Sequence, residues 1–205
     1  MKNEVRVLGL DDSPFEKGNK FCVVIGTFMR ASGQIDGFLC FRVIVDGNDA
    51  TDKIIKNISN SRFFKTLKAI LIDGISLGGF NIIDINRVAS SLNKPVIVII
   101  RKKPNMDEVK EALITMANQK KLSKKEIESR LEMLSKAGPI YKLEVRTKSS
   151  KDKRVIYFQK SHNISLDEAR EIIKLNIINA FIPESIRISH LIGSAIVSGE
   201  SKGGA

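Results

Sequence analysis

The chain of 205 residues contains 42% hydrophobic residues, which is enough for a substantial core and excludes a globally disordered protein. No apolar run reaches the roughly 18 to 20 residues of a membrane span, and the N-terminus lacks a signal-peptide pattern, so we expect a cytoplasmic protein that does not enter membranes. The net charge of +11 is concentrated between positions 101 and 160, which hold 17 Lys or Arg and 8 Asp or Glu, and this suggests either a nucleic-acid face or a solvated basic surface.

The first hundred residues have the pattern of a mixed sheet. Apolar runs predict five strands, at 4–10, 21–29, 38–45, 69–72 and 95–100. The short link around Gly33 predicts an antiparallel hairpin between the second and third strands. Helical spacing predicts one helix from Asn48 or Asp49 to Phe64 and another over 82–92.

This β-β-β-α-β-α-β order is that of the ribonuclease H-like fold. Right-handed crossovers between parallel strands leave few other arrangements of these elements. The sequence therefore predicts an α/β protein with a ribonuclease H-like mixed sheet.

The second half adds a helix pair and a basic hairpin. Helices are predicted at 107–116 and 123–136, and strands at 141–148 and 155–158 flank a polar turn at 149–153. Ser165 and Glu168 form a capping box that begins a helix to about 180, and Pro183 begins another segment. We expect one domain over 1–205, with a core at about 1–103, an extension at about 104–160 and C-terminal helices at about 163–200.

The two cysteines are predicted to be buried free thiols. Folding the first hairpin near Gly33 pairs Cys22 with a position near 44, so Cys22 and Cys40 do not face each other. No CxxC pair or neighbouring His accompanies them, which disfavours a disulfide or a zinc site.

Carboxylates follow three of the predicted strands. Asp11 follows the first strand, Asp46 and Asp49 follow the third, and Asp73 follows the fourth. Each alone could be a turn residue or a helix cap. Held together at one edge of a sheet, they would repel each other unless a divalent cation neutralised them, and Mg²⁺ or Mn²⁺ prefers such oxygen ligands. The pattern therefore indicates a metal-assisted reaction at a phosphodiester.

Motifs in order over nearly the whole chain resemble those of endonuclease V, and most closely those of an uncharacterised, mainly archaeal branch of that superfamily. They read VLGLDDS (7–13), GFLCFR (37–42), ILIDG (70–74), KPVIVIIRK (94–102), LEVRTK (143–148), SHNISLDEA (161–169) and IPESIRISH (182–190). The resemblance implies metal-binding roles for Asp11 and Asp73, a basic residue at Arg101, and an Arg and a helix His at Arg187 and His190.

Two departures accompany the resemblance. Endonuclease V carries a catalytic Glu directly after the Phe-Arg of its third-strand motif, where this chain has Val43, so Asp46 or Asp49 would have to substitute. The Pro-Tyr-Ile-Pro wedge of that family is replaced by the residues at 33–36, which read GQID. The resemblance therefore implies the family's chemistry more strongly than its recognition of deaminated bases.

Two functions follow from these patterns, with a third that is less supported. The first is a metal-dependent nuclease or phosphodiesterase acting on DNA or RNA, with Mg²⁺ or Mn²⁺ at the carboxylates and His190 positioning water or a leaving group. The second is a non-catalytic nucleic-acid-binding protein on a degenerate ribonuclease H-like scaffold, and the third is hydrolysis of a small phosphate ester. In the first two, the residues expected to bind the nucleic acid are Arg101, Arg146, Lys148 and Arg187.

Overall fold

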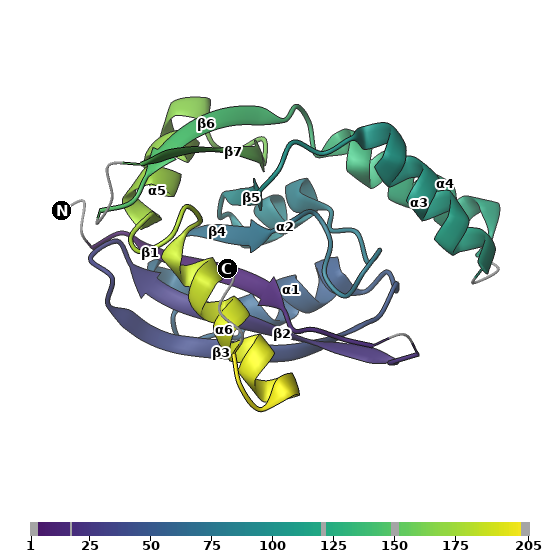
Figure 1. Cartoon of the computed structure of the whole chain (residues 1–205), viewed down its shortest axis with the longest axis horizontal. Helices are drawn as coiled ribbons and strands as arrows, with labels where there is room; N and C mark the ends of the chain where they lie inside the picture. The colour runs from purple at the N-terminus through teal and green to yellow at the C-terminus, as the bar shows by residue number, and fades with distance from the viewer. Residues whose placement is uncertain (1–3, 17, 120–121, 149–151, 202–205) are drawn as a thin grey trace.

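A computed structural model describes residues 4–16, 18–119, 122–148 and 152–201. Within these ranges the chain forms one mixed sheet of seven strands, in the order β3-β2-β1-β4-β5-β7-β6 (Figure 1). The strands are β1 (Arg6–Asp12), β2 (Phe21–Arg30), β3 (Ile35–Ile44), β4 (Leu67–Asp73), β5 (Val96–Ile100), β6 (Tyr141–Arg146) and β7 (Lys153–Lys160). The helices are α1 (Ala50–Ser59), α2 (Ile85–Leu92), α3 (Met106–Gln119), α4 (Lys124–Lys136), α5 (Leu166–Asn176) and α6 (Glu184–Ser198), with a 3₁₀ turn η2 (Phe64–Thr66).

The central strands β1, β4 and β5 are parallel, and the remaining pairs are antiparallel. The predicted element order of the first hundred residues is therefore confirmed. β5 pairs with β7 only from Ile97 to Ile100, opposite Lys160 to Tyr157. Because β7 begins at Lys153, its first residues and their partners in β6 extend past the carboxyl end of β5.

Helices cover both faces of the sheet. Side chains of β1, β4 and β5 alternate between two cores: Leu8, Ile70 and Val98 pack toward α1 and α2, whereas Val7, Leu71 and Ile99 pack toward α5 and α6. Burial on both faces explains why these strands are nearly continuous apolar runs in the sequence. The pair α3–α4 projects to one side, toward which the carboxyl ends of β1 and β4 also point (Figure 1).

Several element boundaries in the structure differ from the predicted ones. The helix predicted to reach Phe64 ends at Ser59, and the helix predicted to reach about 180 ends at Asn176. Cys22 is buried as predicted, but Cys40 is exposed because alternate residues of the edge strand β3 face away from the core. Cys22 lies opposite Val43, so the expectation that the two thiols do not face each other is confirmed. The predicted turn at 149–153 falls largely on 149–151, outside the described residues.

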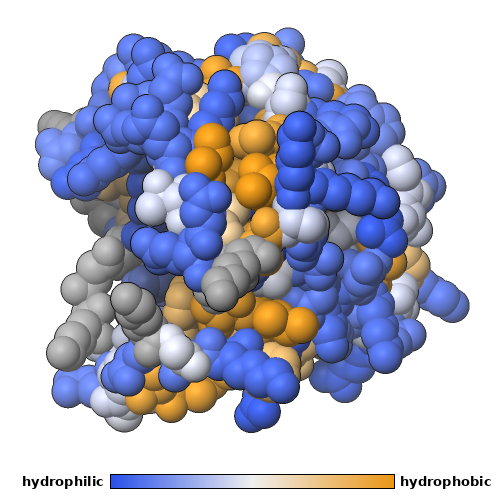
Figure 2. All heavy atoms as spheres, turned by 90° about the vertical axis from the view of Figure 1, so that its right-hand side faces the viewer, coloured by the Kyte–Doolittle hydropathy of each residue, from blue (hydrophilic) through white to orange (hydrophobic). Residues whose placement is uncertain are grey.

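None of the described helices is both long and apolar enough to cross a membrane. Figure 2 views the molecule from the side toward which α3 and α4 project, and shows apolar side chains gathered between hydrophilic ones at the centre of this side.

Candidate functional site

Two of the predicted carboxylates meet at the ends of β1 and β4. The parallel register pairs Gly9 with Leu71 and Leu10 with Ile72, so the next residues along, Asp11 and Asp73, are neighbours on the face covered by α6. A cavity of about 380 Å³ opens at this point. It is lined by Asp11, Asp12, Ser13, Pro14, Phe15, Asp73, Arg101 and His190.

Asp11 is the most buried acid of this cavity. Its Oδ2 lies 2.9 Å from His190 Nδ1, and its Oδ1 accepts a hydrogen bond of 2.9 Å from the backbone N–H of Asp12. Burial raises the pKa of Asp11 to about 8, and the charges of Asp73 and Asp12 add to the rise. Without a bound cation, the charged form of Asp11 is therefore disfavoured at neutral pH.

His190 is held at Asp11 by the seating of α6 on the sheet. The hydroxyl of the preceding residue, Ser189, donates to the backbone oxygen of Gly9 at 2.9 Å and lies 2.8 Å from the hydroxyl of Thr27. Ser189 and Thr27 are both buried. The hydrogen bonds of Ser189 thus fix α6 against β1 and β2 at the residue directly before His190.

Arg101 provides the positive charge on the other side of the cavity. It follows β5 directly, and its guanidinium donates to Asp73 Oδ2 at 2.6 Å. The side chain of Arg101 is one-third exposed. Arg101 therefore both neutralises Asp73 in part and faces solvent, where an anionic ligand could reach it.

Asp12 is a third acid at this cavity, and we did not select it from the sequence. Strand alternation turns its side chain to the opposite face from Asp11, where its Oδ2 accepts a 2.7 Å hydrogen bond from the N–H of Gly78. Burial raises the pKa of Asp12. Val43 packs in the core on this same face. The adjacent acids of the DDS motif were the signal that could have identified Asp12.

Asp46 and Asp49 do not line the cavity. Asp46 Oδ1 accepts a 2.9 Å hydrogen bond from the N–H of Phe80, and Asp49 Oδ1 accepts from the N–H of Ile44 and from Nδ2 of buried Asn81. Both acids therefore hold the loop after β4 against the connection between β3 and α1. That either completes the metal site stays a prediction.

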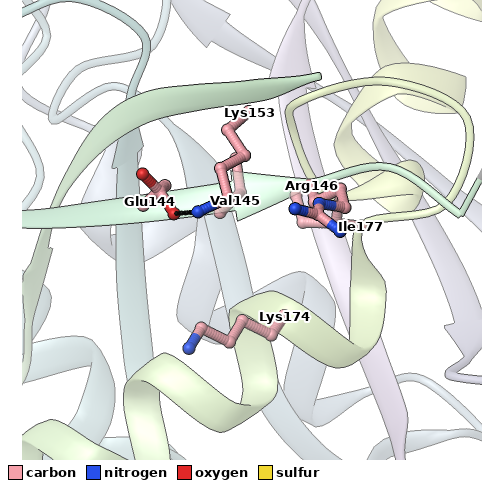
Figure 3. Close-up of a pocket in the computed structure, with 6 residues that line it drawn as sticks. All are labelled: Glu144, Val145, Arg146, Lys153, Lys174 and Ile177. Carbon is pink, nitrogen blue, oxygen red and sulfur yellow. Dashed lines mark ion pairs between the residues drawn. The ribbon is translucent and has the colours of Figure 1, made fainter. Parts of the chain in front are cut away.

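The other expected substrate-binding residues are spread over the surface. Arg187 forms a bidentate contact with buried Glu184 at the start of α6. Arg146 lines a separate cavity of about 290 Å³, where Figure 3 shows Lys153 reaching Glu144 and Lys174 of α5 lying across from the hairpin. Lys148 is exposed just after β6. Of the four predicted substrate-binding residues, only Arg101 lines the carboxylate cavity.

The donor set suits a hydrated cation better than a fully coordinated one. Among the described residues, no group of three or more His, Cys, Asp or Glu side chains is arranged to hold a metal ion. Mg²⁺ keeps several waters and is commonly bound by one or two carboxylates together with substrate phosphates. The neighbouring carboxyl groups of Asp11 and Asp73, with Asp12 lining the same cavity, fit such an ion.

The geometry can be compared with known proteins. The sequence profile of a family described as Endonuclease dU matches residues 3–197. The chain belongs to this family. A UPF0215 protein of Methanothermobacter thermautotrophicus is 35% identical over 100% of this chain and 94% of that protein. This relative is archaeal, and the predicted resemblance to an archaeal, endonuclease V-like family is confirmed.

Two solved structures share the fold. The crystal structure of a protein of unknown function from Archaeoglobus fulgidus has a TM-score of 0.77 and 35% identity, over 94% of this chain and 98% of that chain. Endonuclease V of Ciona intestinalis, bound to a 24mer DNA that contains an inosine followed by a ribo-adenosine, has a TM-score of 0.56 and 15% identity, over 90% and 82% of the two chains. The predicted ribonuclease H-like mixed sheet is confirmed.

Proposed function

We propose that this protein is a divalent-metal-dependent endonuclease that hydrolyses a phosphodiester in nucleic acid. The observation that carries the proposal is the pair Asp11 and Asp73, brought together at the ends of two parallel strands with His190 on one side and Arg101 on the other. Membership of the endonuclease dU family supports it, and so does the fold shared with an endonuclease V that binds DNA. The family's description makes DNA containing deoxyuridine the first substrate to test.

Asp11 and Asp73 would hold Mg²⁺ or Mn²⁺, and Asp12, which lines the same cavity from the opposite face of the strand end, is the candidate for a third acid. When bound, the ion would lower the pKa of a coordinated water and stabilise the charge that develops on phosphorus oxygens. Arg101 lies where it can contact a phosphate, because its remaining guanidinium donors are not all used by Asp73. His190 is oriented by Asp11 through Nδ1, which leaves Nε2 to exchange a proton with the reacting groups.

The position of Asp12 explains how a site could operate with Val43 in place of an acid. The side chains of Asp12 and Val43 lie on the same face of the sheet, and Cys22, the partner of Val43 across the strands, has its Sγ 3.9 Å from Asp12 Oδ2. An acid lost from β3 can thus be supplied from the end of β1. Asp12 is a stronger candidate for this role than Asp46 or Asp49, because Asp12 lines the carboxylate cavity and the other two do not.

The test is cleavage of a labelled DNA duplex with one deoxyuridine, with and without Mn²⁺, by wild type and by Asp73→Asn. We expect Asp73→Asn to lower metal-dependent cleavage by more than about 100-fold, since loss of a direct ligand exceeds the effect of outer groups. Asp52→Asn is the matched control, because Asp52 of helix α1 is an exposed acid that pairs with Arg87 of helix α2. Cleavage without metal, or equal loss in both variants, would contradict the proposal.

Asp12→Asn and Asp49→Asn separate the two candidates for the third acid. Asp12→Asn should reduce cleavage while the Asp49→Asn variant mainly loses stability, because Asp49 accepts two hydrogen bonds that hold the fold. Cleavage normalised to folded protein is the measurement. A selective loss in Asp49→Asn would restore Asp49 as the third acid.

The second candidate function is binding of nucleic acid without cleavage. The buried, apolar Val43 favours it, because endonuclease V has a catalytic acid at the corresponding position in the resemblance. Binding that persists in Asp73→Asn, with no cleavage of DNA or RNA by wild type under any divalent metal, would establish this function instead.

A further inference from the structure

A second cavity adjoins the carboxylates through Arg101. It has a volume of about 560 Å³, compared with about 380 Å³ for the carboxylate cavity, and Arg101 lines both. The other lining residues come from the chain just after β5, from the start of β7 and from the connection between α5 and α6: they are Lys102, then Arg154, Val155 and Ile156, and then Asn179, Ala180, Phe181 and Ile182. A ligand in this cavity would therefore lie directly beside any group bound at Asp73.

The cavity follows from the way the sheet ends. β5 stops at Ile100, whereas the first residues of β7 continue past it without a partner on that side. The connection from α5 to α6 crosses near this gap, and it is held by the bridge between Ile177 and Pro183 and by hydrogen bonds from Asn179 to Glu184. The walls are thus parts of the fold that are tied to the sheet or to α6.

The lining combines positive charge with a flat apolar surface. Its charged residues are Arg101, Lys102 and Arg154, and none of its lining residues is acidic. The guanidinium carbon of Arg154 lies 4.7 Å from the ring centre of Phe181, a cation–π contact. Aromatic rings and guanidinium planes are the surfaces on which unpaired bases stack, while nearby Arg and Lys contact phosphates.

We propose that this cavity binds one unpaired nucleotide of the strand whose adjacent phosphodiester lies at Asp11 and Asp73. The base stacks on the Arg154–Phe181 pair, and Arg101 and Lys102 contact the phosphate between the two positions. The volume lies in the range of about 300 to 1,000 Å³ that small-molecule pockets occupy. This inference rests on the proposed function for the identity of the polymer. It adds a second binding site for the strand, next to the phosphate that reacts.

The test uses short single-stranded oligodeoxynucleotides that carry the fluorescent base 2-aminopurine at one position each, in EDTA so that no cleavage occurs. Stacking quenches this base, so we expect one position to be quenched on binding. Phe181→Leu keeps an apolar side chain in place and removes the ring, and Arg154→Ala removes the exposed cation. Each should abolish the quenching and weaken binding by about 5- to 150-fold, the range for loss of one base-stacking contact.

Arg62→Ala is the matched control. Arg62 is also exposed, and its guanidinium carbon lies 4.7 Å from the ring centre of Phe63, but this pair precedes β4 at the opposite end of the parallel strands. We expect Arg62→Ala to bind and quench like wild type. Thermal unfolding of each variant shows whether a loss reflects unfolding, and Arg154→Ala gives an answer even where Phe181→Leu is unstable.

The outcomes separate this inference from the proposed function. Quenching that is lost in Arg154→Ala and Phe181→Leu supports the cavity, even if no metal produces cleavage and the nuclease proposal fails. Metal-dependent cleavage with no quenched position, or with quenching unchanged in both variants, overturns the cavity alone. Quenching abolished equally by free deoxynucleoside monophosphate at oligonucleotide concentrations shows a mononucleotide site and also overturns it.

Discussion

The substitution Gly9→Ala tests whether close contact between α6 and β1 builds the candidate site. A methyl group at Gly9 would lie 2.4 Å from the backbone carbonyl carbon of Ser185 and 2.5 Å from the backbone nitrogen of Ile186. Non-bonded heavy atoms prefer about 3.5 to 4.0 Å, so helix and strand would have to separate by roughly 1 Å. These two atoms belong to the helix backbone, which cannot rotate away, whereas the third close atom, the side-chain Oγ of Ser185 at 2.5 Å, can.

We expect the loss of stability in Gly9→Ala to lie at the upper end of the range that is typical of overpacked cores. Added methyl groups in packed cores cost about 1–3 kcal/mol, and we expect about 3 kcal/mol for Gly9→Ala, since only movement of α6 relieves it. For a chain of this size that corresponds to a fall of about 6–12 °C in Tm. Urea and thermal unfolding, followed by circular dichroism without metal, measure both quantities. The movement of α6 away from β1 should also weaken the contact between His190 and Asp11.

Gly26→Ala is the control for this reasoning. A methyl group there would lie 2.9 Å from the terminal side-chain carbons of Leu8 and Leu10, which can rotate, so we expect a smaller loss. The double variant Gly9→Ala/Ser185→Gly removes only the Ser185 hydroxymethyl group and should remain as unstable as Gly9→Ala. The reasoning is refuted if Gly9→Ala is no less stable than Gly26→Ala, or if Ser185→Gly restores its stability.

Three further predictions concern separate parts of the molecule. The pKa of Asp11 is raised to about 8 in the folded chain and is near 4 in the unfolded chain, so the folded state binds one more proton between pH 4 and pH 8. Without metal, the free energy of unfolding should therefore fall by up to about 1.4 kcal/mol per pH unit as the pH rises through this range. Urea titrations at several pH values should show that Asp11→Asn removes this contribution to the pH dependence. Arg130 of α4 is buried and donates to the backbone oxygens of Asp46 and Gly47, so Arg130→Ala should speed limited proteolysis within α3–α4, and unchanged cleavage would argue against this docking role. Ser165 begins the capping box of α5, so Ser165→Ala should cost about 1 kcal/mol and lower Tm by about 2–4 °C, whereas an unchanged Tm would show that the cap contributes nothing.

The architecture of the sheet was accessible from the sequence because its signals are local. Strands buried on both faces, such as β4 and β5, are continuous apolar runs. The hairpin strand β6 instead alternates buried and exposed residues. The capping box of Ser165 and Glu168 marked the start of α5 within one residue. Boundaries moved where local signals were absent, as at Ser59, where the helix ends without a glycine or proline.

The pairing of Asp11 with Asp73 was also predictable. Both acids end parallel strands, and parallel strands present their carboxyl ends at the same edge of a sheet. Strand alternation then turns both side chains to the face that α6 covers. His190 could be placed there only through a family resemblance, because its contact with Asp11 joins residues 179 positions apart in the chain.

Tertiary structure alone decided which of the other acids lies at the site. Asp12, Asp46 and Asp49 all stand near strand ends in the sequence, and each could have pointed inward. The loop after β4 folds back onto the connection between β3 and α1, and its Phe80 and Asn81 occupy the oxygens of Asp46 and Asp49. The sequence by itself predicted the sheet, the family and the closeness of Asp11 and Asp73, because these depend on local patterns and strand order. Long-range hydrogen bonds decided where the side chains of Asp12, Asp46 and Asp49 lie, and the extension of β7 past β5 decided the adjoining cavity.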